Sequence, residues 1–291
     1  MRYFITLSYD GAAYHGWQVQ PGVPTVQETL QVAMGTLLRR PVEVVGAGRT
    51  DTGVHALRMV AHFDWMQPLD GGQLAYKLNK LLPRDIAVQS VEPVGDEMHA
   101  RFSAVSRTYH YYLHLHKDPF LQGRSWQVYG PMDFGAMNEA ALLLLGLHDF
   151  TSFSKLHTDT KTNDCTVTEA RWDELSHGQW RFTITANRFL RNMVRAIVGT
   201  LVEVGRGRMS LEGFGCVIGQ KDRCRAGESV PAHGLYLVDV RYEPQRLSPP
   251  AYPTPQSLRF YRAIARDGGE LNPTPTPSPS RGGELRTVNE F

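Results

Sequence analysis

The chain has 291 residues, enough for two modest domains or one large one with a buried core. Its hydrophobic fraction of 42% and charged fraction of 21% are ordinary for a soluble globular protein, and we expect no membrane span and no signal peptide. Three cysteines, an odd number without a CxxC pair, predict reduced thiols and a cytoplasmic location. Because the net charge is only +2, a nucleic-acid partner must be argued from local clusters.

The N-terminal part of the chain mixes strand and helix patterns. Residues 3–9 alternate between apolar and polar as a strand does, and Asp10-Gly11 favours a turn after them. Thr25 and Glu28 have the spacing of a capping box ahead of an apolar helical stripe. The elements predicted here are strands at 3–9, 42–45, 58–63 and 86–91, helices at 25–38 and 70–80, and a glycine-rich loop after residue 45.

The rest of the body repeats this mixture. Asp133 is expected to cap a helix that ends at Gly146. A long apolar stripe predicts a helix over 189–204, and a shorter helix is expected to begin at Ser210. The strands predicted in this part cover 109–116, 166–172, 180–186 and 235–242.

The order of these elements predicts the fold class and the domain organisation. Strands and helices are interleaved without a regular parallel βαβ series, which favours an α+β fold of two related halves, each a sheet backed by helices. We expect an N-terminal half at 1–104, a C-terminal half at 105–245 and a tail at 246–291. Eight of the 18 prolines fall in the tail, which predicts an extended or disordered segment with a weakly signalled helix at 258–265.

The most informative segment is the glycine-rich loop GAGRTDTGVHA at 46–56. It presents one carboxylate, Asp51, close to one guanidinium, Arg49, and its glycines let the backbone turn sharply and a bulky ligand approach. From the residues alone, Asp51 could equally be a turn residue or pair with Arg49 in a surface ion pair. A dinucleotide-binding fingerprint is excluded, because Asp51 stands where the third glycine is required.

Two further groups of side chains are candidates for a site. Arg188, Arg191 and Arg195 recur at helical spacing beside an apolar stripe, which indicates either a solvated basic face or a surface for RNA phosphates. On the strand predicted at 109–116, alternation puts Tyr109 on one face and three histidines on the other. Tyr109 could be a core aromatic. The histidines favour a wet strand face over a metal site, because no carboxylate or cysteine accompanies them.

A family resemblance joins these features. The loop at 46–56 resembles the signature of the tRNA pseudouridine synthase A family, in which an Arg-Thr-Asp-x-Gly-Val-His run carries the catalytic aspartate. The resemblance covers nearly all of residues 2–243 and none of the tail. The other matching blocks are Tyr9-Asp10-Gly11 with Gly16-Trp17-Gln18, Val26-Gln27-Glu28, His99-Ala100-Arg101-Phe102-Ser103-Ala104 continuing to Arg107 and Tyr109, Asp149-Phe150-Thr151-Ser152-Phe153, Phe189-Leu190-Arg191-Asn192-Met193-Val194-Arg195, Lys221-Asp222-Arg223 and Gly234-Leu235-Tyr236-Leu237.

The resemblance implies both a fold and an activity. The fold would be that of the pseudouridine synthases, with two mainly antiparallel, helix-backed halves around a central cleft. The activity would be a tRNA pseudouridine synthase that isomerises uridine at positions 38, 39 and 40 of the anticodon stem-loop, with Asp51 as the nucleophile. This chemistry is redox-neutral, so we expect no cofactor and no metal. Because the carboxylate must be ionised, a cation is expected beside it, either Arg49 or Arg195.

The resemblance also implies roles for residues around the substrate. Tyr109 would pack on the target uracil, and Leu235 would be the apolar residue near it, with a core leucine as the alternative. Arg188 and Arg191 are expected to face RNA phosphate. The expected partner is therefore tRNA, bound by a homodimer and not by a membrane protein. Two rivals stay open, namely an RNA-binding module with an idle carboxylate and a pseudouridine synthase aimed at another RNA.

Overall fold

A computed structural model describes residues 1–155 and 162–243, so the tail and the helix expected at 258–265 lie outside the described residues. The strands are β1 (Arg2–Tyr9), β2 (Val45–Gly46), β3 (His55–Asp64), β4 (Ile86–Val94), β5 (Ala104–His114), β6 (Trp126–Gln127), β7 (Gly146–Asp149), β8 (Asp164–Ser176), β9 (Gln179–Ala186) and β10 (Leu235–Tyr242). The α-helices are α1 (Val26–Leu38), α2 (Gly71–Leu81), α3 (Phe134–Leu142), α4 (Met193–Gly205) and α5 (Leu211–Gln220).

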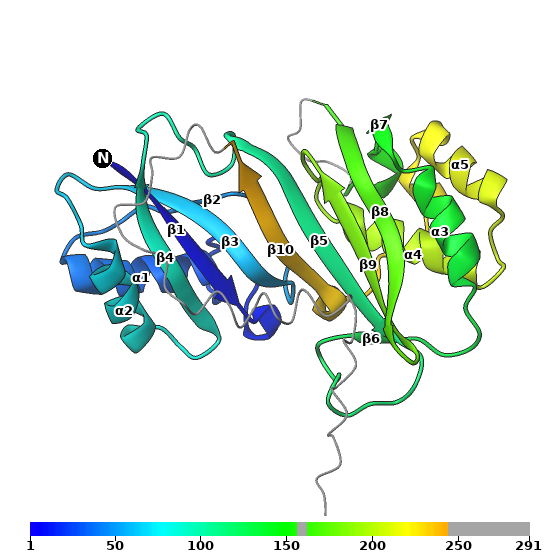
Figure 1. Cartoon of the computed structure of the whole chain (residues 1–291), viewed down its shortest axis with the longest axis horizontal. Helices are drawn as coiled ribbons and strands as arrows, with labels where there is room; N and C mark the ends of the chain where they lie inside the picture. Colours follow the sequence, from blue (N-terminus) through cyan, green and yellow to red (C-terminus); the bar gives the residue numbers. More distant parts are fainter. Residues whose placement is uncertain (156–161, 244–291) are drawn as a thin grey trace, which may run out of the picture. The chain divides into compact units, whose positions relative to one another are not determined.

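The strands form one sheet in the order β4-β1-β3-β10-β5-β9-β8-β7, with β2 beside β3 and β6 beside β5 (Figure 1). Neighbouring strands are antiparallel except in the β3–β10 and β5–β6 pairs. The last strand, β10, lies between β3 and β5, where Tyr236 is opposite His55 and Leu237 is opposite Tyr109. The predicted α+β fold with a mainly antiparallel sheet is confirmed, and β10 joins the strands that precede and follow residue 104 into a single sheet.

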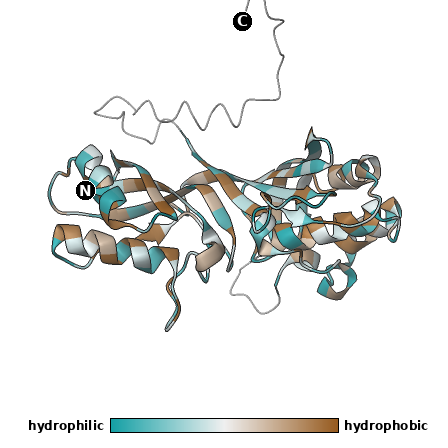
Figure 2. Cartoon of the chain, turned by 90° about the horizontal axis from the view of Figure 1, so that it is seen from below, coloured by the Kyte–Doolittle hydropathy of each residue, from teal (hydrophilic) through white to brown (hydrophobic). Residues whose placement is uncertain are grey.

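Two hydrophobic cores lie along this sheet. One contains buried side chains of α1 and β1, such as Leu30 and Ile5, and the other contains those of α4 and β9, such as Ile197 and Phe182. Brown and teal segments alternate along the strands and helices in Figure 2, as expected of elements with one face in a core. Tyr109 packs against both cores, so it lies at the boundary between them.

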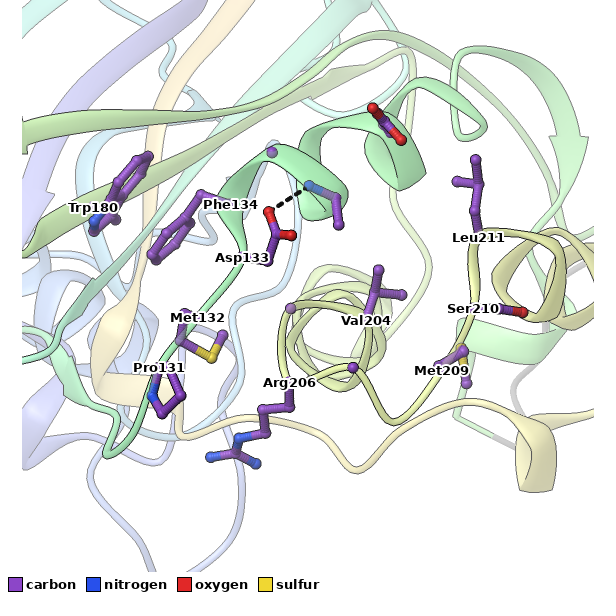
Figure 3. Close-up of a pocket in the computed structure, with 15 residues that line it drawn as sticks. Pro131, Met132, Asp133, Phe134, Trp180, Val204, Arg206, Met209, Ser210 and Leu211 are labelled. Carbon is purple, nitrogen blue, oxygen red and sulfur yellow. Dashed lines mark hydrogen bonds between the residues drawn. The ribbon is translucent and has the colours of Figure 1, made fainter.

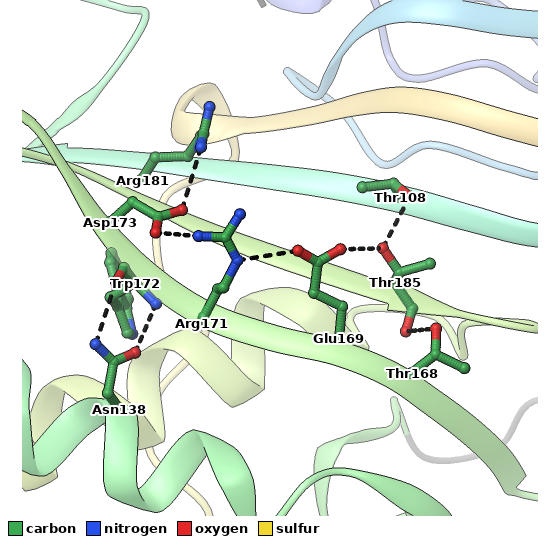
Figure 4. A network of polar contacts seen from close by, with 9 residues as sticks. All are labelled: Thr108, Asn138, Thr168, Glu169, Arg171, Trp172, Asp173, Arg181 and Thr185. Atoms are coloured by element: carbon green, nitrogen blue, oxygen red, sulfur yellow. Dashed lines mark hydrogen bonds and ion pairs between the residues drawn. The ribbon is translucent and has the colours of Figure 1, made fainter. Parts of the chain in front are cut away.

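Polar side chains link strands β5, β9 and β8 in a continuous network (Figure 4). The hydroxyl groups of Thr108 and Thr185 are 2.9 Å apart, and Thr185 donates to Glu169 at 3.2 Å, so Thr108 is the donor toward Thr185. Arg171 then pairs with Glu169 at 3.0 Å and with Asp173. Cross-strand contacts of this kind help to fix the strand register that places Tyr109.

Side-chain caps begin the helices where the sequence predicts them. Thr25, Asp70, Asp133 and Ser210 each accept a hydrogen bond from the backbone N–H three residues further on. Each cap satisfies one of the N–H groups that the first turn of a helix leaves without a partner. These four helix starts are therefore confirmed.

Several predicted bounds are wrong, including both ends of the strand expected at 109–116, which the structure places at Ala104–His114. The helix expected at 189–204 begins only at Met193, because Asn192 has a φ of 69° and the left-handed conformation cannot continue into a right-handed helix. The helix expected to reach Gly146 ends one turn earlier, and Gly146, at a φ of 94°, begins β7 instead. Of the strand expected at 42–45, only Val45 is in a strand, the two-residue β2.

Candidate active site

The loop between β2 and β3 carries Asp51, and the N-terminal segment supports it. The hydroxyl groups of Tyr9 and Thr50 lie 2.8 Å apart, and the Trp17 N–H donates to the Thr50 carbonyl at 3.2 Å. Gly16 has a φ of 86°, and a Cβ there would lie 2.3 Å from the Thr50 carbonyl oxygen. Only glycine permits this approach. The N-terminal motif therefore holds the residue that precedes Asp51.

The other end of the loop is anchored in the same way. Nδ1 of His55 lies 3.1 Å from the Gly11 backbone nitrogen and 3.0 Å from Oδ1 of Asp10, and burial lowers the pKa of His55 although the Asp10 charge opposes that shift. A Cβ on Gly11 would lie 2.0 Å from the Val54 carbonyl oxygen. The Val54 N–H donates to the Asp51 carbonyl at 3.1 Å and closes a turn. Asp51 is thus presented by a loop that is held at both ends.

The Asp51 carboxylate faces two guanidinium groups from the segment that begins α4. Its Oδ1 lies 3.6 Å from Nε of Arg191, and its Oδ2 lies 3.8 Å from Nη1 of Arg195. Both distances are longer than a direct hydrogen bond, so these are charge contacts with room to tighten. The Asp51 side chain is 26% exposed, so part of it is accessible to a ligand.

The two arginines differ in how firmly they are held. The Arg195 side chain is 21% exposed, and its Nε donates to the Val230 carbonyl at 2.7 Å. The Arg191 side chain is 58% exposed. Within residues 1–155 and 162–243, the Arg191 guanidinium pairs only with Asp51. Arg195 is therefore the fixed cation of the site and Arg191 the adjustable one.

The other two arginines expected at the site lie apart from the carboxylate. Arg49 is exposed and forms no ion pair with Asp51 in the part of the chain that the structure describes. Arg188 is half-buried, and its charge lies near the guanidinium of Arg107 and the buried thiol of Cys165. Of the two cations considered for Asp51, the structure therefore brings Arg195 to the carboxylate, and Arg49 faces solvent.

Tyr109 projects from the middle of β5 beside this carboxylate. In register it is opposite Leu237 on one side and Ile184 on the other, and its ring meets the Phe189 ring edge-on with centroids 5.0 Å apart. Burial raises the pKa of Tyr109 to about 12, with the Asp51 charge adding to the effect and a nearby guanidinium opposing it. The phenol is therefore protonated near neutral pH.

Leu235 and Arg191 show what sequence reasoning resolved and what it missed. Leu235 is buried in the second core and is opposite Tyr111 in the sheet register, which fits the core leucine left open as an alternative. The contact between Arg191 and Asp51 is not predicted by the sequence, which suggests RNA phosphate as the partner of Arg191. Its only signal in the sequence is the position of Asn192, a residue type that tolerates the left-handed backbone between Arg191 and α4.

The remaining features of the described residues do not add a second chemical centre. An open hollow is lined by the start of α3, the end of α4 and the start of α5, with the Phe134 and Trp180 rings stacked at its side (Figure 3). Asp51 is not among the residues that line this hollow. Within 1–155 and 162–243, no group of three or more His, Cys, Asp or Glu side chains is placed to hold a metal ion. No helix there is long and apolar enough to cross a bilayer.

Comparison with known proteins identifies the family. Residues 5–103 and 140–243 match the family model described as tRNA pseudouridine synthase. The chain is 58% identical over 244 residues to the tRNA pseudouridine synthase A of Porphyromonas gingivalis, covering 83% of this chain and 97% of that protein. It is 57% identical over 249 residues to the protein of that name from Parabacteroides distasonis (85% and 98% covered) and 42% identical over 247 residues to that from Bacillus subtilis (84% and 100%). The chain therefore belongs to the tRNA pseudouridine synthase family, whose members are isomerases that convert uridine to pseudouridine.

Proposed function

We propose that this protein isomerises uridines at positions 38, 39 and 40 of the tRNA anticodon stem-loop, with Asp51 as the nucleophile and with no cofactor or metal. One observation carries the proposal: a loop held at both ends presents the Asp51 carboxylate 3.6 and 3.8 Å from two guanidinium groups. The names of the relatives support tRNA as the substrate class.

The reaction needs few parts. The N1–C1′ bond of uridine breaks, the freed uracil turns, and C5 joins C1′. C5 then loses its proton and N1 gains one, so the product is an isomer and no electrons are gained or lost overall. A carboxylate can start this sequence as a nucleophile, either on C1′ or on the ring. When the target base covers Asp51 and excludes water, Arg191 and Arg195 offset the negative charge that passes between the carboxylate and the departing uracil.

Other residues position the substrate in this proposal. Tyr109 offers its ring as a stacking surface for uracil and, since its phenol is protonated at neutral pH, acts as a hydrogen-bond donor. The family resemblance also assigns Leu235 to apolar contact near the base, a role that it would carry out from the edge of the second core. Arg49 and Arg188 are free of carboxylate partners among the described residues and contact RNA phosphate. The target base leaves its stack at a cost of a few kcal/mol, which the backbone contacts offset.

We further infer a homodimer in which one tRNA contacts both subunits, a cytoplasmic location, and a division of the body into related halves after residue 104. These inferences rest on the family resemblance. Sedimentation of the pure protein with and without tRNA tests the dimer, and a monomer at micromolar concentration in both conditions would contradict it.

The function is tested by incubating the pure protein with unmodified tRNA and mapping pseudouridine at single-nucleotide resolution. We expect conversion at positions 38, 39 and 40 by the wild type and none by Asp51→Asn, which keeps the side-chain shape and loses the charge. Asp64→Asn is the matched control, because Asp64 pairs with Arg2 at 2.8 Å on the far part of β3. It should retain activity.

The possible outcomes separate the rivals. Tight tRNA binding without conversion by the wild type would mean an RNA-binding module. Conversion of other uridines, or of another RNA only, would mean a synthase with a different target. Turnover above background by Asp51→Ala would exclude Asp51 as the nucleophile.

A further inference from the structure

The guanidinium of Arg107 on β5 hydrogen-bonds to four backbone carbonyls at once. Its Nη1 donates to Ala104 at 3.0 Å and to Asn187 at 2.8 Å. Its Nη2 donates to Ala47 at 3.1 Å and to Arg101 at 2.5 Å. No carboxylate pairs with it in the described ranges, so these carbonyls are its main compensation for partial burial, which lowers the pKa of Arg107.

Two of these carbonyls belong to the segments that carry the reacting charges. Ala47 lies four residues before Asp51 in the supported loop. Asn187 lies four residues before Arg191, and it is itself fixed to β8, because its backbone N–H and its Oδ1 both bond to Thr166, at 3.1 and 2.9 Å. Arg107 therefore connects the loop that presents the carboxylate with the segment that presents the guanidinium groups.

The chemistry of arginine suits this task and that of lysine does not. A guanidinium group carries five N–H donors in a rigid planar fork, whereas an ammonium group carries three donors on one nitrogen. One planar guanidinium group can donate to four carbonyls on three chain segments in fixed directions. The single nitrogen of a lysine side chain has only three donors and cannot bind all four carbonyls. The side chain also starts two residues before Tyr109, so the clamp is built on the strand that places the third functional residue.

We propose that Arg107 is a positioning residue that holds the Asp51 loop and the Arg191–Arg195 segment at their working separation. The proposal rests on the proposed function of Asp51. The carboxylate contacts, at 3.6 and 3.8 Å, are too long to fix the two segments by themselves. Loss of the clamp leaves both segments free to separate, and a misplacement of about 1 Å can reduce a rate about a hundredfold.

The test compares Arg107→Lys and Arg107→Gln with the wild type and with Arg2→Lys. Arg2 is a matched control, because it also combines a backbone contact, to the Met98 carbonyl at 3.0 Å, with a bridge between chain segments away from Asp51. Single-turnover rates at saturating enzyme, the steady-state KM for tRNA and the thermal midpoint are measured for each protein, with the kinetic assays run well below every midpoint. We expect both Arg107 variants to lose about a hundredfold in rate with little change in KM. We expect Arg2→Lys to lose stability only.

A double-mutant cycle with Arg195→Met distinguishes positioning from general stabilisation. If Arg107 acts by bringing Asp51 and Arg195 together, Arg107→Lys should cost much less in the Arg195→Met background than in the wild type. The proposal would be overturned if Arg107→Lys reduced the rate by the same factor in both backgrounds, left the rate unchanged, or raised only KM. If Arg107→Lys does not fold, the same cycle is carried out with Arg107→Gln, which keeps two donors. A wild type that makes no pseudouridine contradicts the proposed function, whereas an active wild type matched by both Arg107 variants contradicts only this inference.

Discussion

Replacing Arg195 with methionine removes the fixed cation of the site while keeping most of its apolar stem. At the observed 3.8 Å, the charge pair is worth about 4 kcal/mol at the effective dielectric of a protein surface and about 1 kcal/mol in bulk water. Both side chains are between a fifth and a third exposed, so a value between these limits, about 2 kcal/mol, is reasonable. If that stabilisation is lost in the reacting complex, the rate falls about 30-fold.

Two further variants show whether lost charge or lost packing causes the fall in rate of Arg195→Met. Arg195→Lys keeps a charge near Asp51 but loses the hydrogen bond from Nε to the Val230 carbonyl, so it should lie between the wild type and Arg195→Met. Arg191→Met removes a cation at 3.6 Å whose side chain is 58% exposed. Because Arg191 is so exposed, its interaction with Asp51 is close to the value of about 1 kcal/mol expected in bulk water. Losing it corresponds to a fall in rate of about fivefold.

The assay follows release of tritium from tRNA labelled at C5 of uridine, because forming the C5–C1′ bond expels that hydrogen. Single-turnover rates at saturating enzyme report the chemical step, and filter binding reports affinity separately. The reasoning is refuted if Arg195→Met binds tRNA more weakly but converts bound tRNA at the wild-type rate. Arg195 would then be a phosphate contact, and Arg191, at 3.6 Å, would be the better candidate for the partner of Asp51.

Four further predictions concern Gly16, His62, the removal of metal ions and the removal of the tail. Gly16→Ala should lower stability by about 1–3 kcal/mol and displace the loop, because its φ of 86° and the 2.3 Å approach to the Thr50 carbonyl exclude a side chain; unchanged denaturation and rate would contradict this. Burial lowers the pKa of His62 from 6.5 to about 4, so between these values the unfolded chain binds a proton that the folded chain does not, and stability falls as pH falls. His62→Gln should remove about 2 kcal/mol of the loss measured by urea unfolding between pH 7 and pH 5. Exhaustive chelation should leave activity intact, and revival of a stripped, inactive enzyme by zinc would disprove that expectation. A chain that ends at Tyr252 should keep its melting temperature and its rate at moderate salt, since the family match ends at residue 243; earlier unfolding or salt-sensitive loss of activity would give the tail a role.

The sequence by itself determined the local elements and the identity of the central carboxylate. Thr25, Asp133 and Ser210 each cap the helix that follows them, because a cap is a hydrogen bond to a backbone group only three residues away. Alternation likewise indicated β10 and β5, because the period of a strand is a property of consecutive residues. Asp51 was identified through its motif, and the close packing at Thr50 depends on Gly16 of the N-terminal segment.

Only the tertiary structure decided which charges meet Asp51. The spacing of Arg188, Arg191 and Arg195 suggested one helical face, but the left-handed backbone at Asn192 starts α4 after Arg191 and brings that residue to the carboxylate instead. Strand order was equally hidden, since β10 pairs with β3 across more than half of the chain and with β5 across more than a third of it. The four carbonyls that Arg107 contacts include one 60 and one 80 residues away in sequence. Such contacts depend on how distant segments pack, and no local period or motif encodes them.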